Sequence, residues 1–224
     1  MTDFQDELWA RIEHIYRAIC DHPFLRGLTD GTLDEGKFAY YVLQDAHYLR
    51  DFARALAITA AKATDDDSIV QFCQDAAGAI LVERSLHDEF IDGFGLTPEQ
   101  AVAVPVQPST LAYTSYLLRV VHQGSFAEAV AVVLPCYWIY ARVGDALLTQ
   151  GSPDPRYQRW IATYGGEEFQ ATVSRVLDLV ERIGRDLSTM ERNRFIEHVV
   201  ITARYEWMFW DAAWRSEAWP AWPA

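Results

Sequence analysis

Cysteine is scarce in this chain, and its three copies lie far apart. Cys20, Cys73 and Cys136 are the only cysteines among 224 residues, and no two of them form a C-x-x-C pair. A disulfide framework or a zinc site needs paired or closely spaced cysteines, so neither organises this fold. We therefore expect three free thiols in a reducing compartment.

Positive charge is also in short supply. The chain has 19 Lys and Arg against 32 Asp and Glu, which gives a formal net charge of −13, and it has no long Lys/Arg cluster. Binding to phosphate backbones or to anionic membranes requires clustered positive charge. We therefore expect neither a nucleic-acid partner nor a membrane partner.

Signals for export and membrane insertion are missing as well. The first nine residues are acidic and amphipathic, without the basic and apolar regions of a secretory signal. The most hydrophobic segment, residues 127–148, is interrupted by Glu128, Arg142 and Asp145 and is therefore not a clean membrane span. We expect a cytoplasmic protein.

The chain has none of the common cofactor motifs. It contains neither a Walker-type loop nor a G-x-G-x-x-G motif. A ferritin-like di-iron site needs a Glu three residues before a His on each of two helices, and no His in the chain has one. We interpret Glu83 and His87, four residues apart, as an ordinary surface pair. The expectation is no metal and no organic cofactor.

What the chain does have is helical periodicity. Hydrophobic residues make up 50% of the sequence, and they recur mainly at three- and four-residue spacing. We predict an all-α protein, a single-domain helical bundle over residues 1–224. The predicted helices cover about residues 4–21, 34–64, 66–93, 109–123, 126–150, 155–164, 166–184 and 188–217.

Capping patterns mark the helix starts, and Pro or Gly marks the ends. The capping boxes pair Thr2 with Gln5, Thr32 with Glu35, Ser125 with Glu128, and Ser188 with Glu191. Pro23 and Gly27 are interpreted as stop signals, and residues 95–108 as the longest loop. The ending Trp219-Pro-Ala-Trp-Pro-Ala224 is either a frayed tail or an aromatic clasp, and we favour the clasp.

Three predicted helices place a reactive group beside an aromatic ring, three or four residues away on the same face. Each group alone has a plain structural explanation, as a buried thiol, an ion-pair partner or a core aromatic. Their joint occurrence favours a functional site, because carboxylates are costly to place in apolar segments without a task. The pairs are Asp45 with Tyr48, Cys136 with Tyr140, and Glu206 with Phe209.

Pro135 lies inside the predicted helix that carries Cys136. A proline there removes one backbone hydrogen bond and costs about 3 kcal/mol if nothing compensates. Our hypothesis is that Pro135 makes a local helix defect that aims the neighbouring thiol into a pocket.

Four segments together resemble the signature segments of the TenA family, thiaminase II. They occur in the family's order and at its separations, and the resemblance extends from about residue 4 to residue 219. The segments are Gln44-Asp-Ala-His-Tyr-Leu49, Leu134-Pro-Cys-Tyr-Trp138, Trp160-Ile-Ala-Thr-Tyr-Gly-Gly166 and Tyr205-Glu-Trp-Met-Phe-Trp210.

The resemblance implies a haem-oxygenase-like fold, a homotetramer, and hydrolysis of aminopyrimidines in thiamin salvage, with thiamin cleavage as a related activity. It implies that Cys136 is the nucleophile, as in the cysteine-bearing branch of the family, since another branch lacks this thiol. Glu206 would be the proton donor and shuttle, and Asp45 would bind the amino edge of the pyrimidine. Tyr48 would enhance the thiol's reactivity. The ring slot would be lined by Tyr113, on the looser motif Ala112-Tyr-Thr-Ser115, and by Tyr140, Tyr164 and Phe209.

Two other functions stay open at this point. The same fold serves haem oxygenases and quinone-cofactor oxidases, so a redox protein that binds haem or iron through His14, His22 or His87 is one alternative. A catalytically idle pyrimidine-binding or regulatory protein is the other. His47 occupies a position where relatives can carry an aromatic residue, which would change the neighbouring hydrogen bonds.

Overall fold

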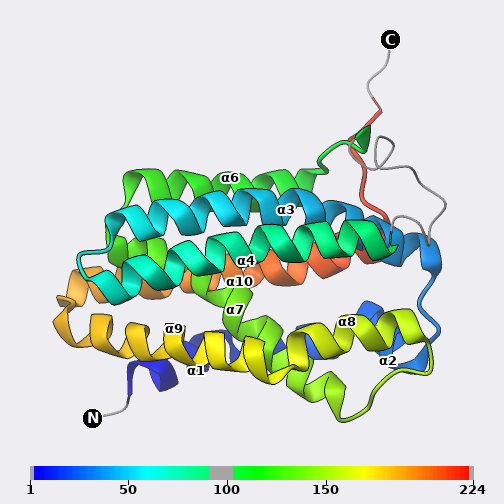
Figure 1. The fold of residues 1–224 in the computed structure, drawn as a ribbon, viewed down its shortest axis with the longest axis horizontal. Coiled ribbons are helices and arrows are strands. Elements are labelled where there is room, and N and C mark those ends of the chain that lie inside the picture. Colours follow the sequence, from blue (N-terminus) through cyan, green and yellow to red (C-terminus); the bar gives the residue numbers. More distant parts are fainter. Residues whose placement is uncertain (1–2, 91–102, 222–224) are drawn as a thin grey trace. The chain divides into compact units, whose positions relative to one another are not determined.

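The structure is a computed structural model that describes residues 3–90 and 103–221, with the side chains of residues 82–90 left aside. Within these ranges the regular secondary structure is entirely α-helical (Figure 1). The helices are α1 (Phe4–Cys20), α2 (Pro23–Asp30), α3 (Glu35–Lys62), α4 (Asp66–Phe90), α6 (Pro108–Gln123), α7 (Phe126–Leu148), α8 (Pro155–Gly165), α9 (Glu167–Asp186) and α10 (Thr189–Arg215).

The chain divides into two compact units. Unit 1 consists of Met1–Leu33 and Gly124–Trp207, and unit 2 consists of Asp34–Gln123 and Met208–Ala224. Helix α10 therefore supplies residues to both units, with the boundary between Trp207 and Met208. Each unit has its own set of packed helices, and one domain over residues 1–224 stays a prediction.

Unit 1 is organised around α7. This helix packs against α8 and α9, and α1 packs against α9 and α2. Among the described helices α7 is the one long and apolar enough to cross a membrane by length and composition, with a mean hydropathy of 1.4. However, 72% of that apolar window is buried inside the structure, so α7 is a core helix covered by protein.

The α7–α8 contact is unusually close at Gly144. A Cβ atom added there would lie 2.4 Å from the carbonyl carbon of Tyr164 and 2.6 Å from the nitrogen of Gly165. Only a glycine allows two backbones to approach this closely. Gly144 therefore fixes where the end of α8, and with it Tyr164, lies along α7.

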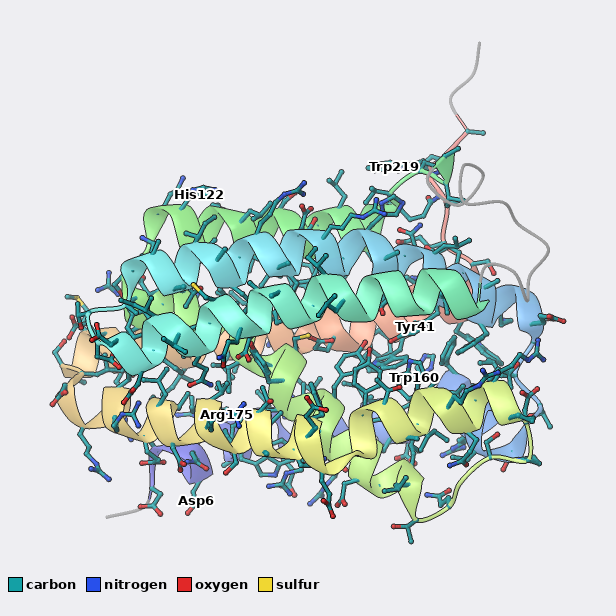
Figure 2. All side chains as sticks on the ribbon, viewed as in Figure 1. Asp6, Tyr41, His122, Trp160, Arg175 and Trp219 are labelled. Atoms are coloured by element: carbon teal, nitrogen blue, oxygen red, sulfur yellow. The ribbon has the colours of Figure 1, made fainter. Side chains whose placement is uncertain are left out.

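Unit 2 is built on α3, which packs against α4 on one side and α6 on the other (Figure 1). Aromatic rings fill its interior. Tyr41, labelled in Figure 2, stacks on Trp210 from the end of α10, with the ring centroids 4.9 Å apart and the planes 6° from parallel. Both side chains are almost fully buried, so they join the end of α10 to α3.

The predicted helices agree with the observed ones to within a few residues, with one omission. Helix α2 begins at Pro23, which the sequence analysis had interpreted as a stop signal. That interpretation was wrong because a proline at the first helical position loses no internal hydrogen bond. His22 caps this helix by accepting a hydrogen bond from the backbone nitrogen of Phe24 at its Nδ1 atom.

Two of the four predicted capping boxes are confirmed. Ser125 and Glu128 exchange backbone and side-chain hydrogen bonds at the start of α7, and Ser188 and Glu191 do the same before α10. The Thr32 box is wrong, because Asp34 caps α3 instead. The N-cap of α1 is Asp3 rather than Thr2, which lies outside the described residues.

The segment before α6 is held by the C-terminal end of the chain. The indole nitrogen of Trp219 donates a hydrogen bond of 2.9 Å to the carbonyl oxygen of Val106 (Figure 2). Glu217 accepts hydrogen bonds from the backbone nitrogen and the hydroxyl of Ser109. The tail therefore binds this segment through residue 219. It does so by hydrogen bonds and not by packing of buried aromatic rings. Trp222 lies outside the described residues.

Candidate functional site

Cys136 is the one partly accessible side chain in a buried stretch of α7. All other residues from Ala129 to Ala141 are buried, whereas Cys136 is half-buried. Pro135 precedes it inside the helix, and α7 continues without a break from Phe126 to Leu148. A thiol that acts as a nucleophile must be reachable, and Cys136 is the one partly accessible side chain between Ala129 and Ala141.

Aromatic rings surround the next turn of α7. The ring centroid of Tyr140 lies 4.8 Å from that of Tyr164 and 6.3 Å from that of Trp160. Trp160 and Tyr164 are 4.9 Å apart on α8, and Figure 2 labels Trp160 on that helix. Gln170 supports the group by donating to the carbonyl oxygen of Ala141 at 2.9 Å. These rings form an apolar wall one turn after the thiol.

Glu206 lies in the part of α10 that belongs to unit 1, and its side chain is 1% exposed. A carboxyl group in such a position is a candidate donor and acceptor of protons. The neighbouring residue Trp207 has its ring 5.9 Å from that of His22, in an edge-on arrangement. The structure therefore buries Glu206, and its role as a proton shuttle stays a prediction.

Unit 2 brings together the residues predicted on α3, α6 and the end of α10. The ring centroid of Tyr48 lies 4.9 Å from that of Tyr113 and 5.8 Å from that of Phe209. Phe52, one turn further along α3, stacks on Tyr48 at 5.5 Å. Asp45 lies one turn before Tyr48 and is 2% exposed. This group therefore combines a buried carboxyl group with a set of rings.

Two further residues of α3 hold the segment that leads into α6. Gln44 donates to the carbonyl oxygen of Pro105 at 3.1 Å and accepts from the backbone nitrogen of Gln107 at 2.9 Å. His47 Nε2 lies 2.8 Å from the carbonyl oxygen of Val104. Because α6 carries Tyr113, these bonds help to position that ring, and they give His47 a local partner.

The eight predicted residues thus fall into two groups of four. Unit 1 holds Cys136, Tyr140, Tyr164 and Glu206, and unit 2 holds Asp45, Tyr48, Tyr113 and Phe209. The sequence analysis gave no role to four residues that contact or support these groups. They are Gln44, Phe52, Trp160 and Gln170. Gln44 and Trp160 lie inside the recognised segments, which was the available signal, whereas Phe52 and Gln170 carry none.

None of the three cysteines forms a disulfide bond in the structure. Burial is the main cause that raises the pKa of the Cys20 thiol, while its hydrogen bond with Tyr16 lowers it. A raised pKa leaves less of the nucleophilic thiolate at neutral pH. Cys73 is exposed on α4. Cys136 differs from the other two in its place, because it lies in the middle of the core helix α7 of unit 1.

The histidines proposed for haem or iron have other surroundings. His14 is exposed on α1, and His22 is buried as the cap of α2. The side chains of His87 and its predicted partner Glu83 lie outside the described residues. Among the side chains that are described, no cluster of three or more His, Cys, Asp or Glu could hold a metal ion.

Known proteins resemble this chain both in sequence and in structure. An aminopyrimidine aminohydrolase of Bacillus subtilis (strain 168) is 38% identical over 216 residues, which cover 96% of this chain and 92% of that protein. The structure of a TenA homologue from P. horikoshii OT3 is similar with a TM-score of 0.87 and 27% identity, covering 96% of this chain and 99% of that one.

A domain of unknown function with a heme oxygenase-like fold, from Shewanella denitrificans OS217, has a TM-score of 0.73 at 15% identity, covering 95% of this chain and 92% of that one. These likenesses confirm the predicted all-α, haem-oxygenase-like fold. The family model described as TENA/THI-4/PQQC matches residues 9–216, which include all eight predicted site residues. The chain therefore belongs to the TENA/THI-4/PQQC family.

Proposed function

We propose that this protein is an aminopyrimidine aminohydrolase of thiamin salvage. Its substrate is 4-amino-5-aminomethyl-2-methylpyrimidine, which it converts to the hydroxymethylpyrimidine and ammonia, with cleavage of thiamin as a related activity. The full-length relatedness to a curated aminopyrimidine aminohydrolase supports the reaction class. The observation that carries the assignment to a cysteine mechanism is the accessible Cys136 in the middle of the buried helix α7.

The reaction needs a strong nucleophile that is also a good leaving group. Water alone replaces the amine on the 5-methylene carbon slowly. The neutral ring holds no negative charge near that carbon that could push the amine out. Addition of the Cys136 thiolate to the electron-poor ring forms a C–S bond, and the electrons of the adduct then expel the amine. Water adds to the exocyclic methylene that results, and the C–S bond breaks to restore the thiolate and the aromatic ring.

We assign each proton transfer in these reaction steps to a side chain. Glu206 protonates the departing amine and accepts the proton of the incoming water, a double task suited to a buried carboxyl group. Asp45 accepts hydrogen bonds from the amino edge of the pyrimidine and pairs with its protonated ring nitrogen, which neutralises charge that develops on addition. Tyr48 enhances the reactivity of the thiol.

The aromatic residues bind the flat ring. Stacking on Tyr113, Tyr140, Tyr164 and Phe209 contributes about 1 kcal/mol for each ring and orients the pyrimidine. All of these steps use side chains of the chain itself, so we propose that the reaction needs no metal or organic cofactor. We further propose a soluble, cytoplasmic homotetramer with a small-molecule pyrimidine as its partner.

Release of the hydroxymethylpyrimidine from the aminomethyl compound, followed by liquid chromatography, tests the proposal. Cys136→Ala should lower kcat at least about a thousandfold, as expected when a covalent nucleophile is lost. Cys73→Ser removes an exposed thiol elsewhere and serves as the matched control with normal turnover. Unchanged turnover in Cys136→Ala would refute the nucleophile assignment.

Two other readouts separate the alternatives. Wild-type protein that binds the pyrimidine without turnover would identify a non-catalytic binding protein. Stoichiometric haem or iron, seen in the visible spectrum and by metal analysis, would identify a redox protein. A comparison of kcat/KM for the aminomethylpyrimidine and for thiamin on one preparation identifies the preferred substrate.

A further inference from the structure

The chain turns back sharply where α10 ends. Ser216 has a φ of 48°, a left-handed conformation that residues other than glycine rarely adopt. Its backbone nitrogen donates to the carbonyl oxygen of Ala213 at 3.2 Å, and that of Glu217 donates to the carbonyl oxygen of Ala212 at 2.9 Å. These bonds form a helix-terminating turn, which directs the chain off the axis of α10 and onto the start of α6 (Figure 1). We call residues 216–219 the C-terminal strap.

The strap supplies a negative charge that α6 itself lacks. Helix α6 begins with Pro108-Ser-Thr-Leu111 and has no acidic residue in its first turn, where unpaired N–H groups carry a partial positive charge. Glu217 accepts hydrogen bonds from the backbone nitrogen of Ser109 at 2.8 Å and from its hydroxyl at 3.1 Å. Its side chain is 16% exposed, and the guanidinium of Arg215 lies 3.7 Å from the same carboxylate. The strap therefore caps α6 with a carboxylate from a distant part of the chain.

A second residue of the strap binds the segment just before α6. The indole nitrogen of Trp219 donates to the carbonyl oxygen of Val106 at 2.9 Å (Figure 2). Gln44 of α3 holds the neighbouring residues Pro105 and Gln107 through their backbone atoms. The entry into α6 is therefore held jointly by α3 and by the strap.

The first turn of α6 is directly connected to the proposed ring slot. Ser109 and Tyr113 lie one turn apart on the same face of α6, and they are only 5% and 1% exposed. In an α-helix, residues at this spacing are joined by a backbone hydrogen bond, so displacement of one moves the other. The ring of Tyr113 lies 4.9 Å from that of Tyr48. All of these residues belong to unit 2. The strap can therefore influence the position of Tyr113.

We propose that Glu217 and Trp219 are positioning residues for the pyrimidine. They hold the start of α6 in place and thereby keep the ring of Tyr113 in the substrate slot. Both act through α6 and not by contact with the substrate. The inference rests on the function proposed above, because that function makes Tyr113 a ring of the slot. It extends that function by giving part of the work of ring binding to residues outside the eight predicted ones.

Binding of the hydroxymethylpyrimidine, measured by calorimetry, tests the inference, and KM for the aminomethyl compound is the second readout. Glu217→Ala should weaken binding and raise KM about fivefold, as expected for one misplaced ring contact, with little change in kcat. Glu217→Gln keeps an oxygen acceptor for Ser109 and should recover most of the affinity. Trp219→Phe keeps a ring without the donor and should weaken binding by a smaller factor. Glu197→Ala, at an exposed position of α10, is the matched control with wild-type values.

A double-mutant cycle with Tyr113 separates positioning from a general loss of stability. Tyr113→Ala by itself should weaken pyrimidine binding. In that background Glu217→Ala should cause no further loss of affinity, because the ring that the strap positions is gone. The decrease in Tm that Glu217→Ala causes should persist in both backgrounds. Amide hydrogen exchange should also be faster in the first turn of α6 in Glu217→Ala than in the wild type.

Unchanged pyrimidine affinity in Glu217→Ala would overturn the inference, and so would an equal loss of affinity with and without the Tyr113 ring. If the wild type binds and converts the pyrimidine and the strap variants match it, the role of the strap alone is refuted. If the wild type binds without turnover, the hydrolase is refuted and the calorimetric comparison still decides the role of the strap. A wild type that neither binds nor converts the pyrimidine refutes the proposed function and the inference together.

Discussion

Replacing Gly144 with alanine tests whether the close α7–α8 approach positions the aromatic wall of unit 1. The added Cβ would lie 2.4 Å from the carbonyl carbon of Tyr164, so α8 or α7 would have to move by about 1 Å to reach an ordinary contact. The neighbouring atoms belong to the backbone of Tyr164 and Gly165 and cannot rotate away. Strain is therefore the expected result.

The magnitude follows from two opposing terms. Alanine in a helix interior is favoured over glycine by about 1 kcal/mol, whereas overpacking a rigid contact costs about 1–3 kcal/mol and more when backbone must shift. Taking the upper part of that range, we expect Gly144→Ala to lower the free energy of unfolding by about 2 kcal/mol. At this chain length, that corresponds to a Tm decrease of about 4–8 °C.

Gly78→Ala is the matched control. Gly78 lies in α4 with no atom within 4 Å of an added Cβ, so the same substitution should raise the free energy of unfolding by about 0.5–1 kcal/mol. Calorimetry of both variants measures the contrast. If the proposed ring slot is correct, displacement of Tyr164 should also raise KM for the pyrimidine roughly fivefold, equivalent to about 1 kcal/mol. A Gly144→Ala protein that melts at or above the wild-type temperature would refute the reasoning.

Two other substitutions probe the helix cap of α7 and the support of α6. Hydrogen bonds from Ser125 are the main cause that holds the pKa of Glu128 below its usual value of 4.5. The ionised carboxylate of Glu128 therefore stabilises the folded protein above pH 4.5. This stabilisation is lost as the pH falls through the folded-state pKa. Glu128→Gln should therefore cost about 0.5 kcal/mol in urea unfolding at pH 7, and the difference from wild type should shrink as the pH falls below 4.5. A difference that stays constant as the pH falls below 4.5 would contradict this account. Gln44→Ala removes two partly buried hydrogen bonds to the segment before α6 and should cost about 1–2 kcal/mol, whereas Gln74→Ala, at an exposed position of α4, should cost almost nothing. Equal stabilities of these two variants would argue against the bracing role of Gln44.

Helical periodicity was sufficient to predict most of the fold. Eight helices were predicted from spacing and capping signals, because amphipathic patterns and caps are local properties of the sequence. Helix α2 was missed because Pro23 can either end a helix or begin one, and the sequence alone does not distinguish these roles. The cap of α3 was misplaced by two residues for a similar reason, since Thr32 and Asp34 both suit an N-cap.

The site was predictable only in part. Cys136, Asp45 and Glu206 were predicted as site residues because reactive groups are conspicuous in apolar, aromatic-rich segments, and the family resemblance supplied their expected roles. Gln170 and Gly144 were not found. Their importance depends on which backbone atoms lie opposite them, namely those of Ala141 and of the end of α8. Such contacts join residues far apart in the chain and leave no local pattern.

The burial of α7 between Ala129 and Ala141, with Cys136 as the one partly accessible side chain, has an evolutionary consequence. Substitutions from Ala129 to Ala141 disturb buried packing at every position except 136, where the side chain is partly open. Selection can therefore change the chemistry at residue 136 without having to repair the core. A protein built in this way can gain or lose a thiol at this position while it keeps its fold.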